Sequence, residues 1–191
     1  MKKVSPFQLA LKIFTSIILA AVIGIMVNFI FINAFSAVWS TILVQALDFL
    51  LLFGVIYSTA WRDGYSEMNR VKVGFVPYDS TKGLKAGCLA MIPGLLITVA
   101  LAITHFTSAD WAWIYRIINM YAIGYVNVWM DPNAALSNIS VWNILITGAY
   151  WLLVPLVTWG AFILGYHRFS FMELFYFKKK KPDASASKKK Y

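Results

Sequence analysis

The chain has 191 residues, of which 60% are hydrophobic and 13% are charged, and its mean hydropathy is +0.69. A soluble domain carries about 25% charged residues, and one small core cannot bury this much apolar surface, so the composition excludes an ordinary soluble domain and indicates an integral membrane protein. The formal net charge of +9 would suit nucleic acid if it covered one face, but the Lys and Arg residues gather at the two ends and in one central segment. That distribution is typical of membrane topology, so we expect no nucleic-acid partner.

Four apolar runs are long enough to span a membrane. They cover about residues 13–35, 40–60, 86–103 and 141–164, and each reaches the roughly 17–25 residues that cross ~30 Å of hydrocarbon as a helix. Because a helix satisfies its own backbone groups in lipid, we expect all four to be α-helices. The first run resembles a secretory signal, but it is longer than the usual core of roughly 7–15 residues, so an uncleaved helix is favoured over cleavage near NAFSA.

The basic residues predict the orientation. A four-helix path places 16 of the 17 Lys and Arg residues on one side, and only Arg116 falls on the other. The positive-inside rule makes the first side cytoplasmic, so both termini are predicted in the cytoplasm, and we expect the plasma membrane. Residues 61–85 then form a short cytoplasmic hairpin, in which the second helix continues to near Gly74 and Asp79 or Ser80 caps the third.

The segment 110–130, DWAWIYRIINMYAIGYVNVWM, is apolar and rich in aromatic residues. Its polar residues Arg116, Asn119 and Asn127 recur on one helical face, and its Trp and Tyr side chains suit the headgroup zone. We expect an amphipathic helix that lies at the outer interface or dips partly in. The alternative is a fifth span, which would place the basic C-terminal part outside and is disfavoured by the positive-inside rule.

The C-terminal part predicts a membrane anchor. In RFSFMELFYFKKKKP, Ser170 and Glu173 have the spacing of a capping box, so we expect a short interfacial helix. Residues 1–177 then form a single helical membrane domain, and residues 178–191 a disordered basic tail. The lysines that follow the helix are predicted to contact anionic lipids of the inner leaflet: Lys178, Lys179, Lys180 and Lys181.

Small residues recur every four positions in two of the runs. The first run carries Ser16, Ala20 and Gly24, and the third carries Ala90 and Gly94. Such stripes let helices approach closely, so each is predicted to contact another helix, either within the chain or in another subunit. Pro93 and Pro155 lie inside the third and fourth runs, where each removes a backbone hydrogen bond and predicts a kink.

Asp48 is a carboxylate inside the second apolar run, and Gln45 lies one turn earlier on the same face. A carboxylate in hydrocarbon costs at least ~2.5 kcal/mol, so Asp48 should face protein or a wet cavity. We expect first a structural hydrogen bond from Asp48 to Asn28, which lies at a similar depth, to a neighbouring helix, or to Arg116 reaching inward. The alternative is a polar site open to the outside, formed by Asp48, Gln45, Asn28 and Arg116, that binds a cation, a proton or a cationic solute.

Catalysis is not expected. The sequence carries none of the common metal-binding, nucleophile or phosphate-loop motifs, and its two histidines, His105 and His167, are predicted on opposite sides of the membrane. We therefore expect no cofactor and no metal. Two functions follow: an accessory or scaffold subunit that packs on another membrane protein or on a second copy of itself, which we expect first, and a small transporter or solute-binding protein that uses the site around Asp48.

Overall fold

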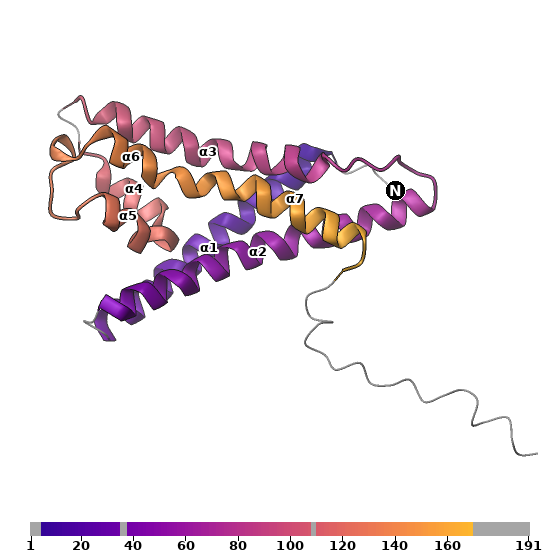
Figure 1. The fold of residues 1–191 in the computed structure, drawn as a ribbon, viewed down its shortest axis with the longest axis horizontal. Helices are drawn as coiled ribbons and strands as arrows, with labels where there is room; N and C mark the ends of the chain where they lie inside the picture. Colours follow the sequence, from indigo (N-terminus) through magenta and orange to yellow (C-terminus); the bar gives the residue numbers. More distant parts are fainter. Residues whose placement is uncertain (1–4, 35–37, 108–109, 170–191) are drawn as a thin grey trace, which may run out of the picture.

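The computed structural model describes residues 5–34, 38–107 and 110–169, and every regular element within these ranges is helical (Figure 1). Three 3-10 turns, η1 (Met120–Ala122), η2 (Leu136–Asn138) and η3 (Ala149–Leu152), interrupt the α-helices. The predicted C-terminal interfacial helix and basic tail lie outside the described residues. The α-helices are α1 (Pro6–Ala34), α2 (Val38–Lys72), α3 (Lys82–Thr104), α4 (Ala112–Ile118), α5 (Ile123–Trp129), α6 (Val141–Thr147) and α7 (Leu153–Tyr166).

Four stretches of the described chain are long and apolar enough to cross a membrane. They are Pro6–Ile30, Ile42–Lys72, Lys82–Thr104 and Val141–Tyr166. The prediction of an all-α membrane protein with four spans is therefore confirmed. Helices α2 and α3 extend beyond their predicted apolar runs. Segments with charged residues continue α2 to Lys72, and α3 begins at Lys82.

The fourth span is not one continuous α-helix. The 3-10 turn η3 separates α6 from α7, and Pro155 lies in the first turn of α7. Proline has no N–H to donate to the carbonyl four residues earlier, so the backbone before it tightens into 3-10 geometry. The kink predicted from Pro155 is thus present as a short 3-10 segment that turns Tyr150 and Trp151 into the protein, where both are buried.

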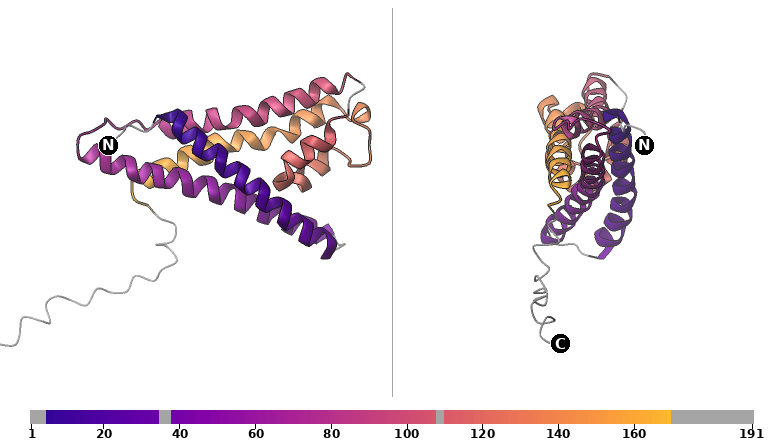
Figure 2. Two further views of the ribbon diagram at one scale, coloured as in Figure 1. Left: turned by 180° about the vertical axis from the view of Figure 1, so that it is seen from behind. Right: turned by 90° about the vertical axis from the view of Figure 1, so that its right-hand side faces the viewer.

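The bundle is a wedge. Helices α1 and α2 lie together and diverge from α3 and α7 toward one end, and the α4–η1–α5 segment fills the space between the two pairs (Figures 1 and 2). We call this the hairpin end. The opposite end, where α1 begins and α7 ends, is called the terminal end. His105 follows α3 at the hairpin end and His167 follows α7 at the terminal end, so the two histidines lie apart.

The segment 110–130 is helical as expected, but it is not a single helix. Two helices of seven residues, α4 and α5, lie on either side of η1, and each is too short to span a membrane. The side chain of Asn119 donates to the Tyr115 carbonyl at 2.8 Å and ends α4, a local bond that competes with helix continuation. The fifth-span alternative is therefore wrong for these residues, and the segment folds back as a helical hairpin within the wedge.

The connection between α2 and α3 follows the sequence expectation at the end of α2, but the expectation that Asp79 or Ser80 is the N-cap of α3 is wrong. Helix α2 ends just before Gly74, whose φ of 75° is a left-handed conformation that favours glycine. Asp79 Oδ1 accepts bonds from the Thr81 backbone N–H at 2.9 Å and the Thr81 hydroxyl at 2.7 Å, although the N-cap position itself is Thr81. These bonds from Thr81, together with Lys85, lower the pKa of the Asp79 carboxyl.

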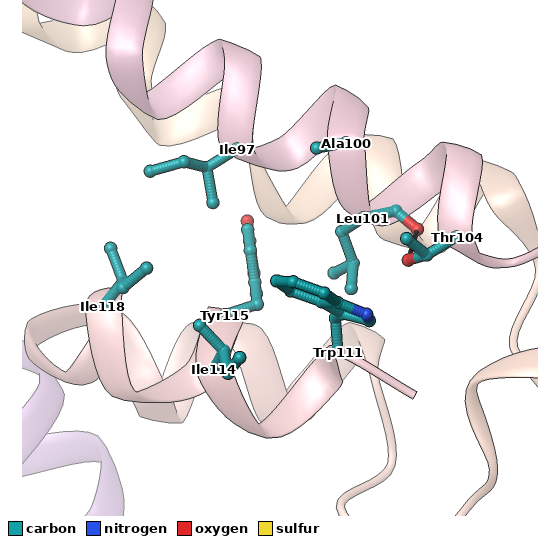
Figure 3. A pocket seen from close by; sticks show the side chains of 8 residues that line it. All are labelled: Ile97, Ala100, Leu101, Thr104, Trp111, Ile114, Tyr115 and Ile118. Carbon is teal, nitrogen blue, oxygen red and sulfur yellow. Dashed lines mark hydrogen bonds between the residues drawn. The ribbon is translucent and has the colours of Figure 1, made fainter. Parts of the chain in front are cut away.

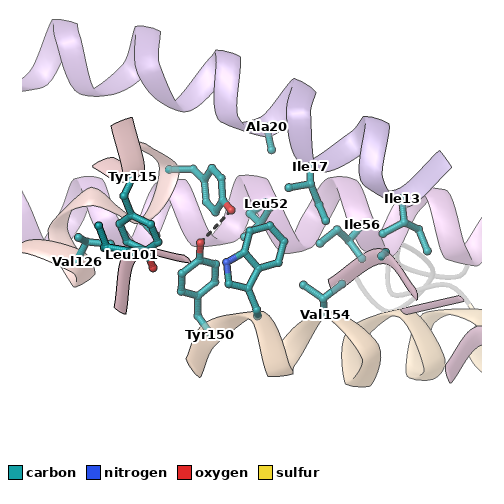
Figure 4. Close-up of a cluster of buried hydrophobic side chains, with 14 of the residues drawn as sticks. Ile13, Ile17, Ala20, Leu52, Ile56, Leu101, Tyr115, Val126, Tyr150 and Val154 are labelled. Atoms are coloured by element: carbon teal, nitrogen blue, oxygen red, sulfur yellow. Dashed lines mark hydrogen bonds between the residues drawn. The ribbon is translucent and has the colours of Figure 1, made fainter. Parts of the chain in front are cut away.

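An apolar layer fills the middle of the bundle. Ile13 and Ile17 of α1, Leu52 and Ile56 of α2, and Val154 of α7 meet there, and none of the five is more than 3% exposed (Figure 4). Polar side chains gather on both sides of this layer, one group at the hairpin end and one at the terminal end. The layer therefore separates two polar regions on the same helices.

Candidate functional site

The small-residue stripe of α1 brings the hairpin against the first helix. Gly24 lies against η1 so closely that a Cβ atom there would be 3.0 Å from Tyr121 Cβ and 3.1 Å from Tyr121 Cα. One turn earlier, Ala20 is fully buried, and the Ser16 hydroxyl lies 2.9 Å from the Thr59 hydroxyl of α2. This stripe thus makes its contacts inside the chain.

The stripe of α3 is also occupied within the chain. Ala90 is buried, and a Cβ at Gly94 would overlap the indole of Trp151 in η3. Both sets of predicted packing residues therefore allow close approach between helices within the chain. They are not free to serve as an interface with another subunit.

Asp48 is the centre of the polar region at the hairpin end. It is only 1% exposed, and its Oδ2 accepts a hydrogen bond from Asn28 Nδ2 at 2.6 Å. The same Asn28 amide also lies within bonding distance of the Gly24 carbonyl, at 2.9 Å, and of the Met120 carbonyl, at 3.3 Å. The other carboxylate oxygen of Asp48, Oδ1, is buried and has no hydrogen-bond partner.

Gln45 holds the hairpin beside Asp48. Its Oε1 accepts from the Tyr125 backbone N–H at 2.9 Å, and its Nε2 donates to the Tyr121 carbonyl at 3.2 Å. One side chain thereby satisfies a donor and an acceptor at the break between η1 and α5, where the helix leaves backbone groups unpaired. Asp48, Gln45 and Asn28 therefore come together as predicted, around the interruption of the hairpin.

Arg116 does not join this group. Its guanidinium donates to the carbonyls of Met130 at 3.3 Å and Asp131 at 3.1 Å, near the end of α5. The expectation that it reaches Asp48 is not met, because α4 and α5 fold back on one another and bring Arg116 to the chain after α5. Nor do Arg116 and Asn119 share an exposed polar face, since Asn119 is 1% exposed.

A layer of buried hydroxyl groups between the hairpin, α3 and the fourth span was missed by the sequence reasoning, which assigned the tyrosines of segment 110–130 to the headgroup zone. The Tyr150 hydroxyl donates to Asn119 Oδ1 and lies 3.0 Å from the Tyr121 hydroxyl. The Tyr115 hydroxyl bridges two threonines, Thr147 at 2.9 Å and Thr98 at 3.2 Å. Buried tyrosines need such partners, so these bonds fix the position of the hairpin in the wedge.

Two apolar cavities flank the hairpin. One of about 190 Å³ lies between α3 and α4, where Ile97 and Leu101 face Trp111 and Tyr115 (Figure 3). The other, of about 240 Å³, is lined by Gln45, Phe49 and Tyr125 on the side of the α2–α5 contact. Asp48 itself is 1% exposed, and the second of these cavities reaches Gln45, one turn earlier on the same helix.

The terminal end holds a cluster of buried charges that the sequence reasoning also missed. Lys82 Nζ lies 2.7 Å from Glu67 Oε2 and 3.9 Å from Asp63 Oδ2, and all three side chains are 5% exposed or less. Lys12 of α1 also pairs with Asp63, at 2.9 Å, and Arg70 lies 3.6 Å from Glu67. The signal was available, because Asp63 and Glu67 continue the buried stripe of α2 that includes Ile56 and Ala60 at spacings of three and four.

Comparison with protein-family models, with curated proteins and with solved structures found no match to this chain. The described residues also contain no group of three or more His, Cys, Asp or Glu side chains that could hold a metal ion.

Proposed function

We propose that this chain is a small, non-catalytic membrane transporter or ion-binding protein that takes a proton or a small monovalent cation at Asp48. One observation carries the proposal. Asp48 is buried, one of its oxygens has no hydrogen-bond partner, and it forms no ion pair within the described part of the chain. A buried carboxylate without a compensating charge is costly, and a bound cation or proton offsets that cost.

The groups around Asp48 support a ligand of single positive charge. The carbonyls of Met120 and Tyr121 already accept bonds from Asn28 and Gln45 at the break in the hairpin. Broken helices at membrane depth are tolerated where they are buried in protein, and in transporters their carbonyls coordinate such ions. One carboxylate with amide and carbonyl oxygens suits a proton, Na⁺ or Li⁺ better than a divalent ion, which draws more carboxylates.

Access requires movement of the hairpin. The cavity beside Phe49 and Tyr125 reaches Gln45, and Gln45 lies one helical turn from Asp48. The closest approach of the hairpin here is at Gly124, where an added Cβ would lie 2.7 Å from Gln45 Oε1. A shift of η1 and α5 away from α2 would therefore break the two Gln45 bonds and open a path from this cavity to the carboxylate.

The orientation proposed with this function places both termini in the cytoplasm of a cell whose plasma membrane holds the protein. The terminal end carries most of the described basic residues, including Lys12, Arg62 and Lys85, whereas Arg116 belongs to the hairpin end. The positive-inside rule supports a cytoplasmic terminal end, so the Asp48 site would lie nearer the outer surface.

The accessory-subunit function stays a prediction. It was favoured because small-residue stripes on α1 and α3 suit helix contacts with a partner, and those stripes are occupied inside the chain at Gly24 and Gly94. The remaining exposed apolar side chains suit contact with lipid as well as with protein.

The proposal is tested with the full chain in proteoliposomes. Uptake of Na⁺, Li⁺ and protons is measured under an imposed gradient, with choline replacing the cation at equal ionic strength. We expect uptake of one of these ions, and we expect Asp48→Asn to abolish it. The matched control is Asp131→Asn, which removes an exposed carboxylate at the same end and should leave uptake unchanged.

Two results would overturn the proposal. One is the absence of ion uptake together with unaltered thermal stability of the purified protein in Na⁺, Li⁺ and acidic buffers relative to choline. The other is uptake or stabilisation that Asp48→Asn leaves intact. Purification with a stoichiometric membrane partner and no ion response would support the accessory-subunit prediction instead.

A further inference from the structure

A polar cavity of about 480 Å³ lies between α1 and α2 at the terminal end, on the opposite side of the apolar layer from Asp48. Helix α1 contributes Lys12 and Thr15 to its wall, and helix α2 contributes Arg62, Asp63, Ser66 and Arg70. The Lys12 side chain is 52% exposed and Arg62 is exposed, so the cavity opens to the surface. It is separate from the Asp48 site and does not depend on the function proposed there.

The charges around this cavity do not balance. Asp63 and Glu67 are the two acids, and they are shared among Lys12, Lys82 and Arg70, while Arg62 forms no ion pair within the described ranges. Four bases against two acids leave an excess of two positive charges. Within this excess of positive charge, Arg70 Nε is buried without a hydrogen-bond partner, so this end of the bundle favours an anion.

The donors suit a phosphate in particular. Arg70 is half-buried, its closest contact to Glu67 is 3.6 Å, and its Nε is buried without a hydrogen-bond partner. The second guanidinium, Arg62, lies on the same wall, with the hydroxyl of Ser66 one turn further along α2. Guanidinium groups match phosphate oxygens as paired donors, and such charge-assisted bonds are stronger than neutral ones.

The apolar surface beside the cavity points to the source of that phosphate. Thr15, in the wall, shares a helical face of α1 with Leu11, Ile18 and Val22, which are 50%, 50% and 51% exposed. A phosphate bound beside Thr15 therefore has an apolar track leading from it along the outside of a membrane-spanning helix. This apolar surface would contribute nothing to the binding of a soluble phosphate compound, whereas it can contact the acyl chains of a lipid.

We propose that this cavity binds the phosphate headgroup of one anionic phospholipid, with its acyl chains along the Leu11–Val22 face of α1. The guanidinium groups of Arg62 and Arg70 bind the phosphate oxygens, and Lys12 lies at the mouth of the cavity. This is a defined site for a single lipid, in contrast to the diffuse attraction of a basic collar for an acidic membrane surface.

Native mass spectrometry of the full chain, extracted gently from vesicles of phosphatidylcholine and phosphatidylglycerol, tests the proposal. We expect one retained phosphatidylglycerol per chain, and we expect Arg62→Gln to reduce its retention about tenfold because one charge-assisted contact is lost. Arg62 is exposed and unpaired, so this substitution should not unfold the protein. Lys72→Gln is the matched control, since it removes an exposed charge from the same helix end outside the cavity, and it should retain the lipid.

Thermal stability in detergent with added inorganic phosphate separates the two sources of phosphate. We expect stabilisation by phosphatidylglycerol and little by inorganic phosphate at equal phosphate concentration. Equal retention of lipid by the wild type, Arg62→Gln and Lys72→Gln would overturn the proposal. Stabilisation by inorganic phosphate that lipid does not exceed would overturn the lipid assignment in favour of a soluble ligand.

Discussion

The two polar regions of this bundle both use carboxylates of α2, but they neutralise them differently. At the terminal end, Asp63 and Glu67 are buried and each meets a lysine, Lys82 at 2.7 Å from Glu67 and Lys12 at 2.9 Å from Asp63. At the hairpin end, Asp48 is equally buried and meets only the amide of Asn28. The two carboxylates at the terminal end are neutralised within the chain, whereas Asp48 is a buried carboxylate without a cation and has a reason to bind one.

The two regions also have different structural roles. The terminal cluster joins α1, α2 and α3 through Lys12, Asp63 and Lys82, so it fixes the helices where charged residues enter the bundle. The hairpin region is held by hydrogen bonds to Gln45 and Asn28 at a broken helix, which are weaker and can be exchanged. We therefore expect the buried ion pairs of the first region to govern stability and the second region to govern the response to cations.

The largest expected effect is at Lys82. Lys82→Met leaves Glu67 buried beside only the more distant Arg70, and we expect the free energy of unfolding to fall by about 3–5 kcal/mol, because one partner of a buried ion pair is removed. Denaturation of the purified variant and wild type in mixed micelles measures this fall in the free energy of unfolding. Lys85→Met is the control, because the exposed Lys85–Asp79 pair should contribute less than about 1 kcal/mol. Equal losses for the two variants would contradict the claim that burial makes the Lys82–Glu67 pair important for stability.

An intermediate effect is expected at Gly24. Gly24→Leu forces η1 away from α1, because even a Cβ there would lie 3.0 Å from Tyr121 Cβ, and we expect a loss of about 1–3 kcal/mol. The same variant should lose the response to cations, since the Asn28–Met120 contact depends on that approach. Gly54→Leu is the matched control, because no atom lies within 4 Å of a Cβ at Gly54. A cation response in Gly24→Leu equal to that of the wild type would show that the hairpin does not form the site.

A small effect on stability is expected at Asp48. Asp48→Asn removes a buried charge that has no ionic partner, so the free energy of unfolding should be unchanged or raised by about 1 kcal/mol in the absence of a ligand. The test compares unfolding in choline with unfolding in Na⁺ or Li⁺, and only the wild type should gain stability in the second condition. A large loss of stability in choline would instead make Asp48 a structural residue.

The smallest effect is expected at Asp79, an exposed carboxylate that provides a reference for the buried ones. Its pKa is lowered in the folded chain by the bonds from Thr81, so its contribution to stability is present above the unfolded-state pKa and is lost as the pH falls through the folded-state value. Asp79→Asn should therefore reduce stability slightly at neutral pH and make the acid-dependent loss shallower. Unfolding measured across the acidic range checks this, and an unaltered pH profile would contradict it.

The four spans, the extension of α2 to near Gly74 and the meeting of Asp48, Gln45 and Asn28 could be predicted, because hydropathy and helical spacing determine them. The fold of residues 110–130 could not, because its break depends on the bond from Asn119 to Tyr115 and on partners such as Tyr150 that are distant in the sequence. Arg116 was misplaced for the same reason. The buried charge cluster within residues 61–85 could not be predicted either, since pairing of Lys82 with Glu67 requires α2 and α3 to be placed side by side.

The most direct test of the account is whether the Asp48 carboxyl itself changes state on ligand binding. Infrared difference spectra of the membrane-embedded protein, between Na⁺ or Li⁺ and choline and between acidic and neutral buffers, report carboxyl groups that gain a cation or a proton. We predict a carboxyl band that appears in the wild type and in Asp131→Asn and is absent in Asp48→Asn. The same carboxyl bands in Asp48→Asn and the wild type would contradict the account.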